Sequence, residues 1–291
     1  MPPEKILGGC DCHVHVVAPL EEFPQSATRS YTASPAPLDC LQAIAAPEGV
    51  SRFVLVQPSF YGTDNSCLLR VLEKLGEDGR GVAAVDSNQV SSSILERLDA
   101  LGVRGLRVNL YSKSLQFAPE RIRDHIEATI EKLPSQNWHV ELIAPLSLLL
   151  KAEEVIAHSP VRVVLDHYAL PDKASFTNDD GRRLLALASL PNVWLKLTAP
   201  YRVVWNPLTT APPANWLAAF LAVASDRCVW GSDWPHTPLD RDQKGQDEPA
   251  PYRQIVYARL LRDFLAALPD SALSKKVLVQ NPSRLYGFPS S

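Results

Sequence analysis

Residues 8–17 read GGCDCHVHVV, a short run in which small or apolar residues alternate with polar ones. Side chains of a β-strand point alternately to its two faces. One face of this predicted strand is therefore expected to carry Asp11, His13 and His15. The opposite face is expected to pack on helices through Cys10, Cys12 and Val14.

Seven more short apolar runs follow, at residues 52–58, 81–86, 104–111, 138–144, 162–168, 193–199 and 228–233. Between them lie segments with apolar residues at three- and four-residue spacing, which is typical of helices with one buried face. These segments are 67–77, 93–102, 121–133, 146–159, 182–190 and 215–225. Eight strands that alternate with helices predict an α/β fold, a (β/α)8 TIM barrel, as a single domain over 1–291.

The connections differ in length on the two sides of the predicted strands. Long, proline-rich segments follow strands at 18–37, 169–180, 200–213 and 234–251, whereas helix-to-strand connections are short. Active sites of such barrels lie at the carboxyl ends of the strands, so this asymmetry predicts a site there. The chain shows no internal repeat or low-complexity tract that would mark a domain boundary.

Composition excludes several classes of partner. Lys and Arg number 29 against 32 Asp and Glu, a net charge of -3, so no overall positive field would attract nucleic acid or anionic lipid. No apolar run approaches the roughly 20 residues that span a bilayer, and the first residues lack a secretory signal, so a cytoplasmic location is expected. The five cysteines are interpreted as reduced thiols. No feature of the sequence indicates an oligomeric state.

Polar residues gather at the ends of three predicted strands. His13 and His15 lie on the first, His167 ends the sixth, and Asp233 ends the eighth. Buried imidazoles and carboxylates are costly without partners, and across a barrel mouth these could form a water-activating site. The same four residues also suit a divalent ion. His125 and His158 are interpreted as structural.

Several motifs resemble those of the amidohydrolase superfamily. They are DCHVHV (11–16), DH (166–167), GSDWPH (231–236) and the closing NPSRLYGF (281–288). Within that superfamily, RSYT (29–32), VQPSFYGTDN (56–65), GLRVN (105–109) and SDWPHT (232–237) resemble the 2-pyrone-4,6-dicarboxylate lactonase family. The resemblance spans nearly the whole chain.

This resemblance implies hydrolysis of an intramolecular ester in a planar pyrone with two carboxylates, as in bacterial breakdown of lignin-derived aromatic compounds. Asp233 is then the expected general base, and His13, His15 and His167 are expected to polarise the carbonyl. Expected cations near the substrate are Arg107, Lys113, Lys196 and Arg202. Expected neutral contacts are Tyr31, Gln57, Ser59, Asn109 and His236.

The chain departs from the pattern of this family at two positions. Lys113 stands where the family has a second Arg, and Ile143 stands where it has a Tyr. Lys pairs with a carboxylate as a point charge and lacks the two parallel hydrogen bonds of Arg. Lactone hydrolysis is therefore the expected reaction, and a lactone other than the pyrone stays open.

Alternatives concern the cofactor and the reaction. No cofactor is expected to be required; the alternative is one divalent cation, Zn or Mn, held by His13, His15, His167 and Asp233. Such an ion would serve a metal-dependent decarboxylase of the same superfamily. A sugar-acid lactonase and a binding protein on an inactive barrel are the other hypotheses. The expected partner is a small anionic lactone.

Overall fold

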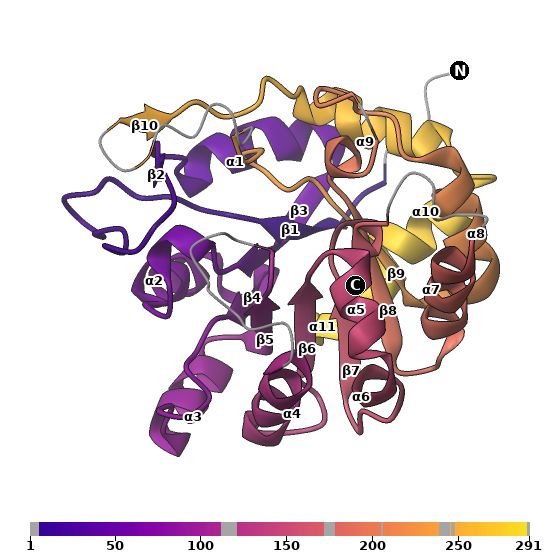
Figure 1. The fold of residues 1–291 in the computed structure, drawn as a ribbon. Helices are drawn as coiled ribbons and strands as arrows, with labels where there is room; N and C mark the ends of the chain where they lie inside the picture. Colours follow the sequence, from indigo (N-terminus) through magenta and orange to yellow (C-terminus); the bar gives the residue numbers. More distant parts are fainter. Residues whose placement is uncertain are drawn as a thin grey trace.

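A ring of eight parallel strands forms the centre of the molecule in the computed structural model, which describes residues 6–111, 121–171, 178–204, 206–238, 245 and 248–289 (Figure 1). The strands are β1 (Gly9–Val14), β3 (Val50–Val56), β4 (Gly79–Ala83), β5 (Val103–Asn109), β6 (His139–Ile143), β7 (Arg162–Leu165), β8 (Val193–Thr198) and β9 (Cys228–Gly231). They pair in chain order, and each overlaps one of the eight predicted runs. The predicted (β/α)8 barrel is confirmed.

The barrel closes between its first and last strands, beyond the end of β9. The amide of Asp233 donates to the carbonyl oxygen of His13 at 2.9 Å, and the amide of His15 donates to that of Trp234 at 2.8 Å. A Cβ atom at Gly231 would lie 2.7 Å from the backbone nitrogen of His13, so only glycine permits this approach. Closure thus brings the H-x-H segment against the predicted carboxylate.

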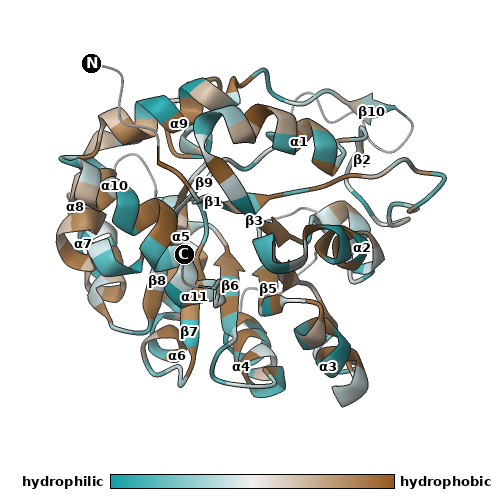
Figure 2. Ribbon diagram, turned by 180° about the vertical axis from the view of Figure 1, so that it is seen from behind, coloured by the Kyte–Doolittle hydropathy of each residue, from teal (hydrophilic) through white to brown (hydrophobic). Residues whose placement is uncertain are grey.

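Helices lie outside the ring, with brown apolar faces and teal polar faces in Figure 2. They are α1 (Leu38–Ala45), α2 (Ser66–Leu75), α3 (Ser92–Ala100), α4 (Ile122–Lys132), α5 (Leu146–Lys151), α6 (Glu153–Ala157), α7 (Asp179–Ser189), α8 (Ala214–Ala224), α9 (Tyr257–Ala266), α10 (Ser271–Lys275) and α11 (Asn281–Tyr286). The six predicted helical segments are confirmed, although 146–159 divides into α5 and α6. Helix α1 was not predicted.

The side chains of β1 do not alternate strictly between the two faces of the strand. The ladder between β1 and β3 is irregular between Asp11 and Val14. Cys10 and Cys12 therefore pack with valines of the other strands and with Leu285 and Tyr286 of α11, and not against the helices that surround the ring, so the expectation for them is wrong. Asp11 instead accepts a hydrogen bond from Tyr257 of α9 at 3.1 Å. An irregular strand pair re-aims side chains in this way.

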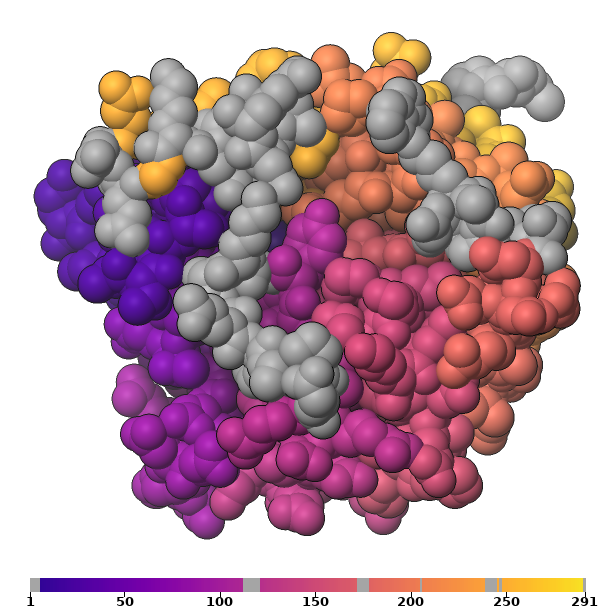
Figure 3. All heavy atoms as spheres, viewed as in Figure 1, coloured from indigo at the N-terminus to yellow at the C-terminus, as the bar shows by residue number. Residues whose placement is uncertain are grey.

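The long connections all lie at the carboxyl ends of the strands. Colours in Figure 3 follow one another around the visible face from indigo to orange, as expected when each strand–helix unit packs beside the previous one. Two of the connections pair through β2 (Thr32–Ala33) and β10 (Pro249–Ala250). In the part of the chain that the structure describes, no helix has the length and apolar character to cross a membrane.

Candidate active site

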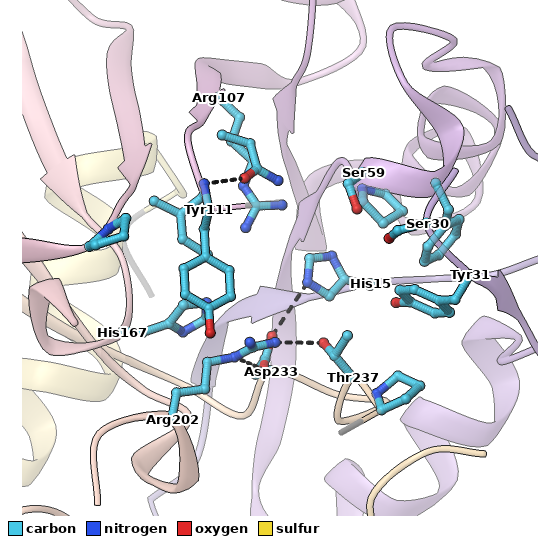
Figure 4. A pocket seen from close by; sticks show the side chains of 16 residues that line it. His15, Ser30, Tyr31, Ser59, Arg107, Tyr111, His167, Arg202, Asp233 and Thr237 are labelled. Atoms are coloured by element: carbon cyan, nitrogen blue, oxygen red, sulfur yellow. Dashed lines mark hydrogen bonds and ion pairs between the residues drawn. The ribbon is translucent and has the colours of Figure 1, made fainter. Parts of the chain in front are cut away.

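A cavity of about 320 Å³ opens at the carboxyl ends of the strands (Figure 4). It is lined by predicted site residues from six barrel strands or the segments after them: His15, Tyr31, Ser59, Arg107, Asn109, His167, Arg202 and Asp233. Ser30, Tyr31 and Ser59 lie on one side, and His167 lies on the other. Ile143 contributes to an apolar part of the wall. The structure therefore places most of the predicted residues around one space.

Four predicted residues that the structure describes do not line the cavity: His13, Gln57, Lys196 and His236. His13 is fully buried, with its ring beside those of His15 and His167. Gln57 is buried, and its amide donates to the carbonyl oxygens of Gly62 and Asp64, which holds the following loop. His236 is buried behind the cavity wall. Lys196 is fully buried inside the barrel, so its expected place at the substrate rim is wrong. Lys113 lies outside the described residues.

The carboxylate of Asp233 is held by one oxygen and presents the other to the histidines. Its Oδ2 accepts hydrogen bonds from the Tyr201 hydroxyl at 2.7 Å and from Nε of Arg202 at 3.1 Å. Its Oδ1 lies 3.4 Å from Nε2 of His15 and 3.7 Å from Nε2 of His13. Among the described residues, Oδ1 has no hydrogen-bond partner. An unengaged carboxylate oxygen is what a general base requires.

Each histidine of the site is fixed through its Nδ1 atom. Nδ1 of His15 donates to the carbonyl oxygen of Val56 at 2.7 Å, because a carbonyl can only accept. Nδ1 of His167 is 2.6 Å from the Thr198 hydroxyl. Nδ1 of His13 is 3.2 Å from Nζ of Lys196. The Nε2 atoms of His13 and His15 are therefore left for Asp233 and the cavity.

A buried group of charges lies directly beneath these histidines. The Lys196 ammonium contacts the carboxylate of Glu141 and lies 3.6 Å from Oδ1 of Asp166. Arg107 donates to Oδ2 of Asp166 at 3.3 Å and to the carbonyl oxygen of Gln57 at 3.0 Å. Register places Arg107 of β5 beside Glu141 of β6. Two cations and two carboxylates thus neutralise one another inside the barrel.

Two of the site residues have backbone angles that L-residues seldom adopt. Asp233 has φ of 61° and His167 has φ of 50°, both in the left-handed region. Such conformations cost about 1–3 kcal/mol each and concentrate at functional sites. The sharp turn at the end of each strand directs these two side chains into the cavity.

Electrostatics at the site favour an ionised Asp233 and neutral His13 and His167 at pH 7. Burial alone would raise the pKa of Asp233, but Arg202 and the neighbouring histidines hold that pKa well below its usual range. Burial and the nearby Lys196 hold the pKa of His13 well below its usual range. Burial likewise lowers the pKa of His167. The base can therefore accept a proton at neutral pH.

Four buried histidines make stability fall in acid: His13, His139, His167 and His236, the last with its pKa lowered by burial to about 4. In the unfolded chain they bind protons below pH of about 6.5. The unfolded state then binds more protons, so the free energy of unfolding falls by about 1.4 kcal/mol per pH unit for each such histidine. Burial raises the pKa of Asp11 to about 6. Between pH 7 and 5 the folded state therefore binds a proton at Asp11 that the unfolded state does not, and this offsets part of the loss of stability. Urea unfolding from pH 7 to 5 measures the net loss; stability independent of pH would contradict it.

The site also contains a set of atoms with the spacing of a metal site. Ligand atoms of His13, His15 and Asp233 lie within 4.8 Å of one another, as do those of His13, Asp166 and His167. The first set belongs to the residues predicted for a divalent cation. Its fit to such an ion depends on which nitrogen of His13 carries the proton.

Sequence reasoning missed the residue that holds Asp233 in place. Tyr201 is buried, and its hydroxyl donates to Oδ2 of the carboxylate. It precedes the predicted Arg202, directly after β8. A tyrosine beside a predicted site arginine, at the carboxyl end of a barrel strand, was the available signal. Thr237, which accepts from Nη2 of Arg202 at 2.7 Å, was also missed.

Comparison with known proteins gives a consistent family assignment. A family model described as amidohydrolase matches residues 10–288. A 2-pyrone-4,6-dicarboxylate hydrolase of Comamonas testosteroni is 31% identical, covering 96% of this chain and 90% of that protein. A 4-sulfomuconolactone hydrolase of Rhizobium radiobacter is 28% identical, with the same two coverages.

Two further similarities extend the comparison. A D-galactarolactone isomerase of Agrobacterium fabrum is 26% identical over 82% of this chain and 77% of that protein. A crystal structure of a probable 2-pyrone-4,6-dicarboxylic acid hydrolase from Acinetobacter baumannii, with citric acid bound, superposes with a TM-score of 0.79. It is 26% identical and covers 97% of this chain and 100% of that one.

Proposed function

The chain belongs to the amidohydrolase family, and from this premise we propose that its cavity hydrolyses the lactone ester of a small dicarboxylated substrate such as 2-pyrone-4,6-dicarboxylate. The enzyme is a hydrolase that acts on a lactone, as are the hydrolases it is similar to. The observation that carries the proposal is the unengaged Oδ1 of Asp233, which faces two histidines at the floor of a cavity lined by two arginines.

Asp233 activates the water in this proposal. Its Oδ1 takes a proton from water while the water oxygen bonds to the lactone carbonyl carbon, and the carbonyl oxygen becomes an oxyanion. Collapse of this intermediate breaks the bond from that carbon to the ring oxygen, which receives the proton from Asp233. One water is consumed, and the carboxylic acid that forms releases its remaining proton to solvent as it becomes a carboxylate. A positioned base contributes about 10²- to 10⁴-fold.

The histidines divide the remaining tasks. The rings of His13 and His167 lie 4.8 Å apart, and in this proposal both stabilise the charge that develops on the carbonyl oxygen. His15 donates through Nδ1 to Val56, and its Nε2 lies 3.4 Å from Oδ1 of Asp233. In this proposal His15 positions the base. This role differs from the carbonyl-polarising role that the sequence predicts for His15.

The cavity wall supplies the groups that recognise an anionic substrate. Arg107 and Arg202 line it together with Tyr31, Ser59 and Asn109. Guanidinium groups bind carboxylates through charge-assisted hydrogen bonds, which are about twice as strong as neutral ones. Ile143 and the prolines of the wall suit the apolar edge of a ring. This lining favours a small, flat, anionic lactone.

We propose that the reaction needs no resident metal. Arg202 and Tyr201 already engage Oδ2 of Asp233. The Lys196 ammonium can only donate, so Nδ1 of His13 accepts and Nε2 carries the proton. A divalent cation would need Nε2 unprotonated. The donor set therefore does not fit such an ion, and no step is assigned to one.

Chelator-treated enzyme and 2-pyrone-4,6-dicarboxylate provide the test, with loss of the pyrone absorbance as the signal and metal analysis alongside. We expect ring opening without added metal. Carbon dioxide release that depends on Zn or Mn would instead indicate the decarboxylase alternative. Failure to open this substrate, an aldaric lactone or a muconolactone would contradict lactone hydrolysis and favour a binding protein.

The variant Tyr201→Phe should retain the fold and lose about tenfold in kcat, since hydrogen bonds to charged groups contribute about 1.5–3 kcal/mol. The hydroxyl stabilises ionised Asp233, so its removal raises the pKa of that carboxyl. The acid limb of kcat/KM should therefore move to higher pH. The control is Tyr257→Phe, which removes the matching tyrosine–carboxylate bond at Asp11, outside the cavity. An unmoved acid limb in Tyr201→Phe would contradict the role of Tyr201.

A further inference from the structure

Lys196 occupies an unusual position for a lysine. Its ammonium lies at the centre of the barrel with no exposed surface, on β8, beneath the cavity. Burying an unpaired charge costs several kcal/mol, so such a residue needs close partners. The carboxylates of Glu141 and Asp166 provide them, and Arg107 balances the second negative charge. Charge pairing explains how Lys196 is tolerated there, and its third contact indicates what it does.

That third contact is with His13. Nζ of Lys196 lies 3.2 Å from Nδ1 of the imidazole in hydrogen-bonding geometry. An ammonium has three donors and no acceptor, so Nδ1 must be the acceptor and must be unprotonated. Oδ1 of Asp166 is 3.3 Å from the same nitrogen, but it forms no hydrogen bond among the described residues. A proton on Nδ1 would also face the ammonium directly.

We infer that Lys196 is a positioning residue that fixes His13 as the Nε2–H tautomer and so makes it the N–H donor to the lactone oxyanion. This inference rests on the proposed function. Nε2 of His13 lies 3.7 Å from Oδ1 of Asp233 and has no hydrogen-bond partner among the described residues. His13 does not itself line the cavity, so in this inference the lactone carbonyl reaches the buried N–H beside Oδ1 of Asp233, which does line it. The donor is oriented before substrate binds.

The two histidines of the H-x-H segment thereby have opposite tautomers. His15 carries a proton on Nδ1, where the carbonyl oxygen of Val56 accepts it, and its Nε2 lies 3.4 Å from Oδ1 of Asp233. His13 carries its proton on Nε2, because Lys196 occupies Nδ1. The proton on Nδ1 of His15 is thus bound by the backbone, whereas the proton on Nε2 of His13 lies beside Asp233. Two residues of one H-x-H segment acquire different functions from the atoms that contact their Nδ1 nitrogens.

Two carboxylates hold the ammonium, those of Glu141 and Asp166. Oε2 of Glu141 contacts Nζ of Lys196, and Nε2 of His139 lies 3.8 Å from the same oxygen. The lysine side chain is long and flexible, so the fixed carboxylates of Glu141 and Asp166 together hold its ammonium in one place. The order of contacts from the barrel floor upward is His139, Glu141, Lys196, His13.

The first test reads the tautomer directly in the wild-type enzyme. Protein labelled with ¹⁵N in its histidines gives long-range proton–nitrogen correlations that distinguish the two tautomers, and His13→Gln identifies the His13 signal. We expect a protonated Nε2 on His13 and a protonated Nδ1 on His15 at neutral pH. A protonated Nδ1 on His13 would overturn the inference.

The second test removes the donor while keeping the interior neutral. The double variant Lys196→Met/Glu141→Gln deletes one charge of each sign and leaves Arg107 paired with Asp166. We expect kcat to fall about 10²- to 10³-fold with KM little changed, and the His13 signal to become a mixture of tautomers. The single variant Glu141→Gln retains the ammonium and should retain the Nε2–H signal.

The outcomes separate this inference from the function on which it rests. A folded double variant with wild-type kcat, or with an unchanged His13 signal, would contradict the role of Lys196. If the double variant fails to fold, the wild-type spectrum still decides the tautomer. That spectrum is recorded without substrate. An enzyme that opens no lactone would therefore contradict the proposed function, whereas the tautomer of His13 would still be decided by the spectrum alone.

Discussion

The variant Asp233→Asn should lower kcat by about 10²- to 10⁴-fold, the contribution of a positioned general base. Asparagine has nearly the same shape, and its amide oxygen can still accept the hydrogen bond that Tyr201 donates to Oδ2. It cannot accept the proton of water. The loss should therefore appear in kcat at every pH at which the wild type is active, and the circular dichroism spectrum should remain that of a folded barrel.

A second buried aspartate provides the control for this variant. Asp11 accepts hydrogen bonds from the amide of Ser232 and the hydroxyl of Tyr257, and it does not line the cavity. Asp11→Asn should lower thermal stability and change kcat by less than about tenfold, because only a structural hydrogen bond is altered. Near-normal turnover by Asp233→Asn would remove that residue from the role of base.

The variant His13→Leu should lower kcat by about 10²- to 10³-fold, since it removes one donor to the oxyanion. Leucine is similar in volume to histidine, so the buried position stays filled. KM should change little, because the N–H of His13 acts on charge that develops after binding. Steady-state kinetics of the purified variant measure both parameters.

The matched control is a histidine outside the cavity. His125 of α4 is half-buried and does not line the cavity. His125→Gln should have kcat within about threefold of the wild type, as is usual for a substitution away from a site. If His13→Leu matched this control, the oxyanion would have to be stabilised without His13.

The sequence predicts the barrel well because hydrophobic periodicity reports directly on burial. All eight strands and six helical segments follow from it. Helix α1 was overlooked because it is only eight residues long and follows directly on a proline-rich loop. The side-chain directions on β1 were wrong because an irregular ladder interrupts the alternation after Asp11, and no residue type marks that position.

The site was predictable where a motif fixes a residue at the end of a strand. His15, His167 and Asp233 are of this kind, and all three line the cavity. Lys196 was expected near the substrate because the prediction used its charge and did not use the face of the strand on which it lies. Trp194, two residues earlier on β8, packs with Cys10, Cys12 and the valines of the strands inside the barrel. Side chains two residues apart on a strand share a face, so Lys196 also points to the inside. The contacts of Tyr201 depend on how two loops meet, which single-sequence patterns do not report.

The central claim is that a water molecule, activated by Asp233, attacks the carbonyl carbon of the lactone. The most direct measurement is turnover of 2-pyrone-4,6-dicarboxylate, 4-sulfomuconolactone and D-galactarolactone in water enriched in oxygen-18, followed by mass spectrometry of the products. We predict one labelled oxygen per product molecule, located in the newly formed carboxylate. An unlabelled product of unchanged mass would indicate isomerisation of the lactone, and an unlabelled product that has lost carbon dioxide would indicate decarboxylation; either result would contradict the account.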